Sequence, residues 1–376
     1  MGRRTNLCSL RPAPNGATAS LMRRFPWLTP RIILRHAPHA VIVVLACTAL
    51  ANLLGSTWSL PERLAHFPVY WSPLALVLGA GFAAMKQWRW SLAALVLAGG
   101  YGAQLALLWQ PPSGQTPGKT MAAGSVPRTV LSFNVLKSNR QHATVLGALQ
   151  AQQADVVYLT EMTPAWFDAL APLENDYPHR LGNRNHSDWL LSKHPLESAR
   201  AVAMTFATAQ AANAPGTPSQ IGPLANSYEE KWSRDELLVA TVVMDGKRVR
   251  VGGIHPPTPM NSRNIMQQRA CAAIYRQELD ADPAADAKLL MGDFNTSHFS
   301  PTFRLILKTT GLQDTVRGFG YGPTWGPRMP RDPWLPWLGV PIDHVLASGN
   351  VRVLDHEVGP NLGSDHRWVK VRFVVE

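Results

Sequence analysis

The chain has 376 residues, 46% of them hydrophobic, and a mean hydropathy of −0.08. This length suffices for one large domain or two smaller ones, and the hydropathy excludes a protein made only of membrane helices. Residues 1–127 contain 11 Lys or Arg and one Asp or Glu, whereas residues 128–376 contain 25 and 24. Because this basic excess lies beside apolar segments, membrane topology explains it better than general DNA binding does.

Residues 1–35 form a polar, Arg-rich arm, and three segments without charged side chains follow it, with His66 taken as neutral. These segments are Ala37–Leu60, His66–Met85 and Trp90–Trp109. Each is about 20 residues or longer, which is the length a helix needs to cross about 30 Å of hydrocarbon. We therefore expect about three transmembrane helices within residues 36–109. Pro68 and Pro73 weaken the second segment, so two spans are the main alternative.

Basic residues predict the orientation of these helices, because loops rich in Lys and Arg stay in the cytoplasm. Seven Arg precede the first span, Arg63 is the one basic residue of the first connection, and Lys86 and Arg89 lie in the second. We expect the N-terminus and the second connection to be cytoplasmic. The first connection and everything after Trp109 then lie outside, and the lipid bilayer is an expected partner. The length of the arm argues against a cleaved signal peptide.

Residues 110–127 are rich in Pro, Gly and Ser and are expected to form a flexible linker. After them, apolar strands and helices mix without strict alternation, which predicts an α/β sandwich rather than a barrel. Strands are expected at 130–135, 155–159, 237–244, 248–254, 289–291, 342–347 and 368–375, and helices at 144–152 and 262–279. Ala201–Tyr228 has no charged residue and is expected to be a long loop or insertion over the site.

Polar side chains stand at the ends of the expected strands. Asp293 and Asn295 follow an apolar run in LLMGDFNTSHFS, where Gly292 allows the backbone to turn. Other strand ends deliver Asn134, Glu161, His255 and Asp343, and Ser364-Asp365-His366 precedes the last strand. Each taken alone is ordinarily a turn, cap or solvated residue. Their number within one domain instead indicates a single site.

The sequences SFNV, LTEM, IHPPTP, GDFN, PIDHV and GSDH, in this order, resemble the deoxyribonuclease I-like endonuclease/exonuclease/phosphatase superfamily. The resemblance implies a four-layer α/β sandwich over residues 128–376, with two mixed β-sheets flanked by helices. It also implies a site at one end of the sheets that uses Mg²⁺, for which Mn²⁺ substitutes. Similarity to membrane-anchored bacterial members implies the bacterial inner (plasma) membrane, with the catalytic domain periplasmic.

The metal ligands implied by this resemblance are oxygen donors. Glu161 is similar to the metal-binding glutamate of the superfamily, assisted by Asn134 and, depending on the number of metal ions, by Asp293 or Asp365. Such a set suits Mg²⁺, which prefers few carboxylates together with water and phosphate oxygens. Some nuclease relatives carry an Asp two residues after the first-strand Asn, where this chain has Leu136. This departure argues against an abasic-site endonuclease.

The catalytic residues are carried over in the same way. His366 resembles the essential histidine, which contacts the scissile phosphate or helps to activate water, with Asp343 bound to its other ring nitrogen. Asp293 would orient or deprotonate the attacking water, and Asn295 would donate to the phosphoryl oxygen. His255 lies where hydrolytic relatives place a second histidine and is a candidate general acid.

Trp325, in YGPTWGP, is expected either to line the substrate pocket or to pack beneath the loop. The main functional hypothesis is a membrane-anchored, Mg²⁺-dependent phosphodiesterase or phosphatase acting on a lipid or a small phosphorylated substrate, because the catalytic domain is nearly neutral. The alternative is an extracytoplasmic endonuclease or exonuclease acting on DNA or RNA through a locally basic groove. A non-catalytic membrane-bound binding module is the third hypothesis, and the intact set of polar residues argues against it.

Overall fold

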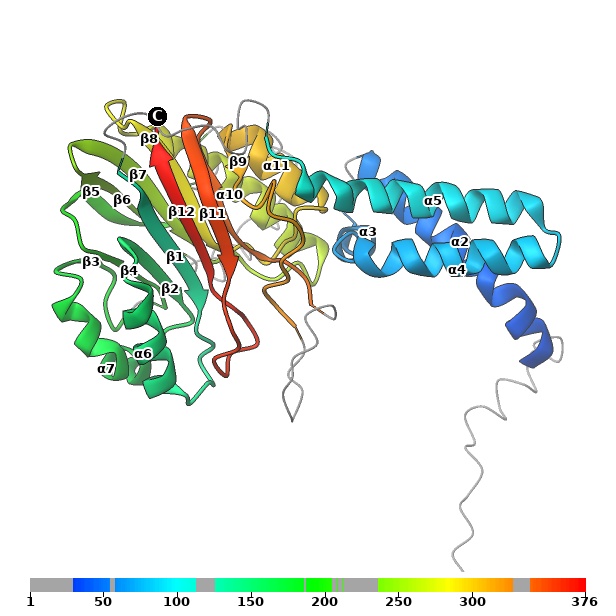
Figure 1. The fold of residues 1–376 in the computed structure, drawn as a ribbon, viewed down its shortest axis with the longest axis horizontal. Coiled ribbons are helices and arrows are strands. Elements are labelled where there is room, and N and C mark those ends of the chain that lie inside the picture. The colour runs from blue at the N-terminus through cyan, green and yellow to red at the C-terminus, as the bar shows by residue number, and fades with distance from the viewer. Residues whose placement is uncertain are drawn as a thin grey trace, which may run out of the picture.

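The computed structural model describes residues 30–54, 58–112, 126–185, 187–204, 208, 212, 236–326 and 339–376. A helical region (residues 30–109) projects from an α/β domain (residues 126–376), as Figure 1 shows. Its helices are α2 (Pro30–Leu53), α3 (Ser59–Leu64), α4 (Pro68–Ala84), α5 (Trp88–Ala106) and the 3₁₀ turn η1 (Leu107–Trp109). Most of the expected linker, residues 113–125, lies outside the described residues.

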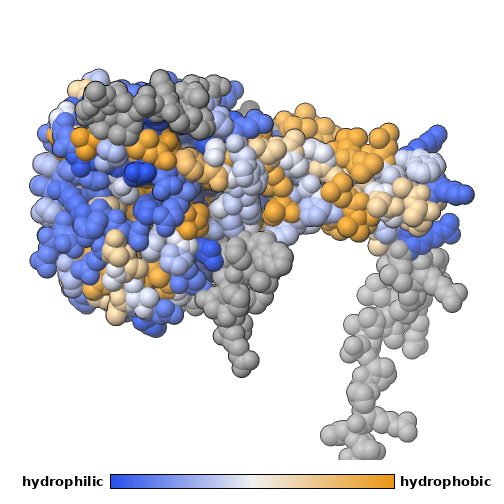
Figure 2. Space-filling view, in the orientation of Figure 1, coloured by the Kyte–Doolittle hydropathy of each residue, from blue (hydrophilic) through white to orange (hydrophobic). Residues whose placement is uncertain are grey.

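Two helices in the described residues are long and apolar enough to cross a membrane, Arg35–Leu53 and Trp88–Trp109. Only 17% and 28% of their most apolar windows are buried, so their hydrophobic side chains face outward (Figure 2). The second expected segment, 66–85, forms α4, which is shorter, with 17 residues, because Pro68 begins the helix. At 1.5 Å per residue α4 is about 26 Å long, close to the thickness of a hydrocarbon core.

Small residues allow the long helices to pack closely. The hydroxyl of Ser91 on α5 donates to the carbonyl of Gly79 on α4 at 2.9 Å, and that of Ser72 on α4 donates to Ala98 at 3.0 Å. The phenol of Tyr101 donates to the carbonyl of Leu45 on α2 at 3.2 Å. Such hydrogen bonds and close backbone contacts hold helices together where the surroundings are as apolar as the side chains.

The α/β domain contains two mixed β-sheets. Its strands are β1 (Arg128–Asn134), β2 (Val156–Thr160), β3 (His179–Leu181), β4 (Trp189–Ser192), β5 (Leu196–Ala203), β6 (Glu236–Met244), β7 (Lys247–Ile254), β8 (Ala287–Asp293), β9 (Gln313–Asp314), β10 (Asp343–Ala347), β11 (Val351–Val358) and β12 (Val369–Val375). The strand orders are β11-β12-β1-β2-β4-β3 and β5-β6-β7-β8-β10-β9. The β1–β2 and β7–β8 pairs are parallel, and the other pairs are antiparallel.

Three apolar clusters hold the layers together. Alternating residues such as Tyr158, Leu238 and Leu289 fill the space between the two sheets. Helices α6 (His142–Gln152) and α7 (Pro164–Leu170), followed by η2 (Ala171–Asn175), cover one outer face, and α10 (Ser262–Asp280) and α11 (Pro301–Thr310) cover the other. The order helix, sheet, sheet, helix confirms the four-layer α/β sandwich.

Several elements were not expected from the sequence, namely β3, β4, β5, β9, β11, α7 and α11. Strand β5 is an exposed edge strand with mixed polar and apolar residues, so it lacks the apolar run or alternation that marks a buried strand. Strand β5 includes residues 201–203, where the expected 201–228 loop begins. The prediction of a loop is therefore wrong for these three residues. Most of the remaining loop lies outside the described residues.

The helical region is joined to the α/β domain by polar contacts. Glu62 of α3, which is fully buried, accepts from Arg269 Nη2 at 3.2 Å and from the Thr302 backbone N–H at 3.3 Å. The carbonyl of Leu108 accepts from the backbone N–H groups of Gly318 at 2.8 Å and Gly320 at 3.1 Å. The end of α2, the whole of α3, the start of α4 and the end of α5 therefore lie on the side of the bundle that faces the domain (Figure 1).

Candidate active site

Strand ends from both sheets meet at one edge of the sandwich. Asp293 ends β8 and pairs directly with Asp343, the first residue of β10. Asn134 ends β1 beside Thr160 of β2, and Glu161 follows β2. Because β1 lies against β8 and β10 across the two sheets, all these polar groups gather in one place. His255, which follows β7, joins them from the neighbouring strand.

The backbone of the site adopts conformations that most side chains avoid. Gly292 has φ +146°, and a Cβ there would lie 1.9 Å from the carbonyl oxygen of Ile254, so only glycine fits. Leu136, Glu161 and Asn295 have φ values of 62°, 59° and 50°, in the left-handed region. Such residues each cost about 1–3 kcal/mol and concentrate at functional sites, where the surrounding structure enforces the conformation.

His366 and Asp343 form a buried pair. The Nδ1–H of His366 donates to Asp343 Oδ2 at 2.9 Å, so the other ring nitrogen, Nε2, points away from Asp343. Thr324 Oγ1 accepts from the Asp343 backbone N–H at 3.0 Å and fixes the start of β10. Ser364 Oγ accepts from the His366 backbone N–H at 3.0 Å and donates to the carbonyl of Asn134 at 2.8 Å. Both partners of the pair are thus held in one orientation.

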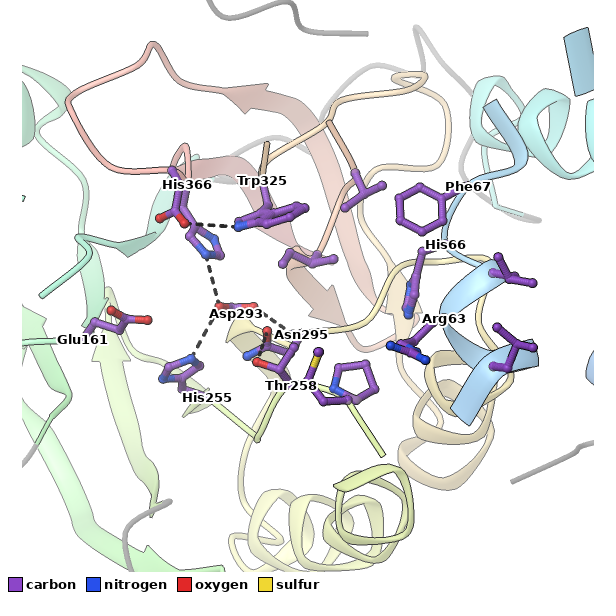
Figure 3. Close-up of a pocket in the computed structure, with 17 residues that line it drawn as sticks. Arg63, His66, Phe67, Glu161, His255, Thr258, Asp293, Asn295, Trp325 and His366 are labelled. Atoms are coloured by element: carbon purple, nitrogen blue, oxygen red, sulfur yellow. Dashed lines mark hydrogen bonds and ion pairs between the residues drawn. The ribbon is translucent and has the colours of Figure 1, made fainter. Parts of the chain in front are cut away.

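Asp293 occupies the centre of the site (Figure 3). Its Oδ2 lies 3.6 Å from His366 Nε2 and 3.5 Å from His255 Nε2. The same oxygen accepts from Asn134 Nδ2 at 3.1 Å, while Oδ1 accepts from the Asn295 backbone N–H at 2.8 Å. A buried carboxylate between two imidazoles is suited to exchanging protons with either of them.

The carboxylates determine the charge of His366. Burial alone lowers the pKa of His366, but the nearby carboxylates of Asp343 and Asp293 outweigh it and raise the pKa to about 10. Burial raises the pKa of Asp343, and His366 opposes that rise. The proton of the pair therefore stays on the imidazole. A cation bound to the same carboxylates would compete with this proton and bring the pKa of His366 down.

Glu161 and Asn134 lie side by side at the ends of β2 and β1. Glu161 Oε1 accepts from Asn134 Nδ2 at 3.3 Å, and Oε2 accepts from the Lys137 backbone N–H at 3.1 Å. Asn134 Oδ1 accepts from the Leu136 backbone N–H at 3.0 Å. The amide of Asn134 thus turns its NH₂ group toward the carboxylates, and ligation of a metal through Oδ1 would require the amide to rotate.

Asp365 provides a further oxygen donor. Its Oδ2 accepts from Trp325 Nε1 at 3.3 Å, whereas Oδ1 is buried and has no hydrogen-bond partner among the described residues. An unpaired buried carboxylate oxygen is costly unless a cation or a donor satisfies it. Glu161, Asp293 and Asp365 all line the cavity, and their carboxylate oxygens are the donors that Mg²⁺ and Mn²⁺ prefer. Among the described residues, Asp293, Asp343 and His366 are the group at this site whose ligand atoms lie within 4.8 Å of one another.

A second cluster, formed by His298, Asp314 and His344, lies outside the cavity and beside the loop that follows Asp293. His298 Nδ1 contacts Asp314 Oδ2 at 2.7 Å, and His344 Nε2 donates to the carbonyl of Thr296 at 2.8 Å. Burial lowers the pKa of His344 to about 3, so His344 is neutral. His298, Asp314 and His344 lie close enough to hold a cation, but none of the three lines the cavity. The cluster anchors the loop that follows Asp293.

Asn295 connects two loops of the site. Its Nδ2 donates to the carbonyl of Pro256 at 3.0 Å, and its Oδ1 accepts from Thr258 Oγ1 at 3.2 Å. These bonds hold the HPPTP segment against the GDFN segment. The second N–H of the amide is left over and can donate to a phosphoryl oxygen.

A cavity of about 650 Å³ opens over these residues. Predicted site residues line one side: Glu161, His255, Asp293, Asn295, Trp325, Asp365 and His366. Leu60, Arg63, Leu64, His66 and Phe67 of the helical region line the other (Figure 3). This second group was not expected from the sequence to belong to the site. The single signal was Arg63, the one basic residue in its connection.

Comparisons with known proteins place residues 131–366 in a family model described as Endonuclease/Exonuclease/phosphatase family. A solved structure of this family from Bacteroides vulgatus is 15% identical, covers 67% of this chain and 100% of its own, and has a TM-score of 0.50. A structure from Beutenbergia cavernae DSM 12333 is 20% identical over 66% of this chain and 72% of its own, with a TM-score of 0.49. D. rerio TDP2 in complex with a single-strand DNA product is 14% identical over 66% and 98%, with a TM-score of 0.47. The curated proteins gave no match.

Proposed function

Since the chain belongs to the endonuclease/exonuclease/phosphatase family, whose domain is that of a hydrolase, we propose that it is a membrane-anchored, Mg²⁺-dependent phosphoesterase. The observation that supports this most is the arrangement of His366, Asp343 and Asp293 beside a set of oxygen donors. Phosphoester hydrolysis needs a proton acceptor for water, an acid for the leaving oxygen and groups that neutralise phosphate charge.

In this proposal each side chain has a role that its position allows. Asp293 accepts a proton from the attacking water, whose oxygen bonds to phosphorus while the ester P–O bond breaks. His255, 22% exposed and beside Asp293, gives a proton to the leaving oxygen, so the products are an alcohol and a phosphate. His366 and Asn295 donate to the phosphoryl oxygens.

Glu161 and Asp365 are the proposed ligands of the cation, with Asn134 joining them if its amide rotates, so that Asp293 stays available as the base. The bound ion would neutralise phosphate charge. Trp325 lies over this part of the cavity, where its indole holds Asp365, and we assign it to substrate binding.

The helical region is the proposed anchor in a bacterial inner membrane. Its long helices expose mostly apolar side chains. The exposed basic residues Lys86, between α4 and α5, and Arg89, in the first turn of α5, lie at the end of the helices farthest from the α/β domain. If that end is cytoplasmic, three helices carry the chain across and the α/β domain is periplasmic. The arrangement in which α3 and the end of α5 face the domain supports this topology.

Metal-dependent hydrolysis by the full-length protein in detergent tests this function. We expect cleavage of bis-p-nitrophenyl phosphate with Mg²⁺ or Mn²⁺, none with EDTA, and a loss of about two orders of magnitude or more in Glu161→Ala. The matched control is Glu174→Ala, since the Glu174 side chain is 45% exposed, pairs with Arg180 and does not line the cavity. Turnover that is indifferent to EDTA contradicts the proposal. Faster cleavage of plasmid DNA or RNA than of phosphodiesters with apolar groups favours the nuclease alternative.

A further inference from the structure

The cavity over the catalytic groups is a composite of two regions of the chain. Its far wall is formed by α3 and the residues that connect α3 to α4, which are 59–67. Glu62 and His66 fix this segment, because Glu62 is bound to Arg269 and His66 is bound to Ser297 of the α/β domain. The segment therefore has a defined position relative to Asp293, and its side chains belong to the site.

Arg63 brings a positive charge to this wall. Its guanidinium lines the cavity, and its Nε is buried without a hydrogen-bond partner among the described residues. The neighbouring carboxylate, Glu62, is already paired with Arg269, and the structure gives Arg63 no ion pair within the residues it describes. The planar guanidinium of arginine matches the geometry of phosphate. Because Arg63 lines the cavity and has no carboxylate partner among the described residues, it is available to bind a phosphate group.

His66 adds a neutral donor. Its Nδ1 accepts from the Ser297 backbone N–H at 3.1 Å, so the proton of the neutral ring is on Nε2. This nitrogen is buried in a side chain that is 6% exposed, lines the cavity and has no partner among the described residues. Arg63 and His66 thus line the cavity from the side opposite His366, and each carries a buried donor that has no partner among the described residues.

The remainder of the wall is apolar. Leu60, Leu64 and Phe67 line it, and Met260 of the α/β domain, with 59% of its surface exposed, lies in the facing loop. Phe67 directly precedes Pro68, the first residue of α4, and two turns further along this helix Leu76 and Val77 expose 50% and 69% of their surface. The cavity therefore joins a polar catalytic end to an apolar end beside the membrane region.

We propose that residues 59–67 form the second half of the substrate site and that the substrate is a phosphoester carrying a long apolar chain, as a membrane lipid does. Arg63 and His66 bind phosphate oxygens, and Leu64, Phe67 and Met260 contact the chain. The inference rests on the proposed phosphoesterase function, and it extends it by assigning a substrate class. It also explains the lone arginine on the side of the membrane opposite Lys86 and Arg89.

A series of p-nitrophenyl alkyl phosphodiesters, from methyl to dodecyl, tests the proposal on the full-length protein in nanodiscs with Mg²⁺. We expect kcat/KM to be about tenfold or more higher for the dodecyl than for the methyl ester, which corresponds to burying a few methylene groups. Phe67→Ser and Met260→Ser should remove most of this preference, because they should lower kcat/KM for the dodecyl ester much more than for the methyl ester. Met260→Ser changes an exposed loop residue and should leave folding intact.

Arg63→Gln should raise KM for every member of the series about tenfold or more while changing kcat little, because a contact made before and during the reaction affects binding alone. The matched controls are Arg89→Gln, at the far end of the helices, and Phe319→Ser, which is 42% exposed and does not line the cavity. If the preference for long esters arises only because they partition into the lipid, Phe67→Ser and Phe319→Ser should affect it equally. If it arises from contact with the cavity, only Phe67→Ser should reduce it.

The outcomes distinguish the two proposals. If the methyl ester is hydrolysed with Mg²⁺ and chain length has no effect, the phosphoesterase function stands and the lipid inference is overturned. The same holds if Phe319→Ser reduces the preference as much as Phe67→Ser does, or if single-stranded DNA is cleaved faster than the dodecyl ester. If no ester is hydrolysed with Mg²⁺, the proposed function itself fails.

Discussion

The helical region and the α/β domain place their apolar side chains in opposite ways. In the helical region, leucine and valine side chains such as Leu76, Val77 and Leu92 face outward, and contacts between helices use small residues. In the α/β domain, large apolar residues are buried between the layers, and polar groups gather at one edge. This difference is the one that the proposed membrane anchor requires, and the segment 59–67 lies where the two regions meet.

The largest effect is expected from Gly292→Ala, which should disrupt the fold of the α/β domain and leave the helical region unchanged. The new Cβ would lie 1.9 Å from the Ile254 carbonyl oxygen at φ +146°, so β7 and β8 must separate where Asp293 is placed. We expect loss of about 4 kcal/mol or more of stability, with little soluble folded domain. Gly147→Ala on α6 is the control, because its Cβ meets nothing within 4 Å and should stabilise the helix slightly. Thermal unfolding followed by circular dichroism measures both.

Asp343→Asn should remove activity with little change in the fold. The amide cannot hold the Nδ1–H of His366 as the carboxylate does at 2.9 Å, so the ring loses its fixed tautomer and charge. By analogy with other His-Asp pairs, kcat should fall about 10²–10⁴-fold. Steady-state hydrolysis is the measurement, with near-ultraviolet circular dichroism to verify folding. A folded Asp343→Asn variant with normal kcat would contradict the role of Asp343 in fixing the tautomer and charge of His366.

Glu62→Ala tests the contact between the regions. The buried carboxylate binds Arg269 at 3.2 Å and the Thr302 N–H at 3.3 Å, and its loss leaves the arginine without this partner. Breaking such a pair costs about 3–5 kcal/mol, whereas removing Glu174 from its exposed pair with Arg180 should cost less than about 1 kcal/mol. Protease cleavage between α3 and α4 should become faster in Glu62→Ala alone. Equal resistance in both variants would show that α3 is held by other contacts.

The smallest expected effect is a pH dependence of stability from His344. Burial lowers the pKa of this ring to about 3 in the folded protein, while in the unfolded chain it titrates near 6.5. Below pH 6.5 the unfolded state therefore binds a proton that the folded state does not. The lowered pKa of His344 therefore favours unfolding as the pH falls below 6.5. The free energy of unfolding decreases by up to about 1.4 kcal/mol per pH unit between pH 6.5 and pH 3, and above pH 6.5 this effect is absent. Denaturant titration at pH 7 and pH 5 should show a smaller pH dependence in His344→Gln than in the wild type.

The elements predicted from sequence were those whose pattern is local. Strands at 237–244 and 248–254 and a helix at 262–279 were expected, and the structure has them as β6, β7 and α10. Two further strands carried apolar runs that ended in Asn134 and Asp293. Their meeting could be predicted because the family resemblance implied a site at one end of the two sheets. Strand β5 lacked such a run and was missed.

The far wall of the cavity could not be predicted in this way. Arg63 and His66 lie more than 200 residues from Asp293 along the chain, and only the docking of α3 on the α/β domain brings them to the site. The contact depends on Glu62, which had no distinguishing pattern apart from being the one acidic residue of its region. The tautomer of His66 likewise depends on the backbone of Ser297, which is a tertiary contact.

The most direct test of the central claim is the kcat of His366→Ala on bis-p-nitrophenyl phosphate with Mg²⁺, measured on the folded full-length protein. The account predicts a fall of about 10³-fold or more, with His179→Ala, a half-buried histidine of β3, retaining wild-type turnover. A His366→Ala protein that is folded and turns over at the wild-type rate would contradict it, because the hydrolysis would then arise outside the site built from Asp293, Asp343 and His366.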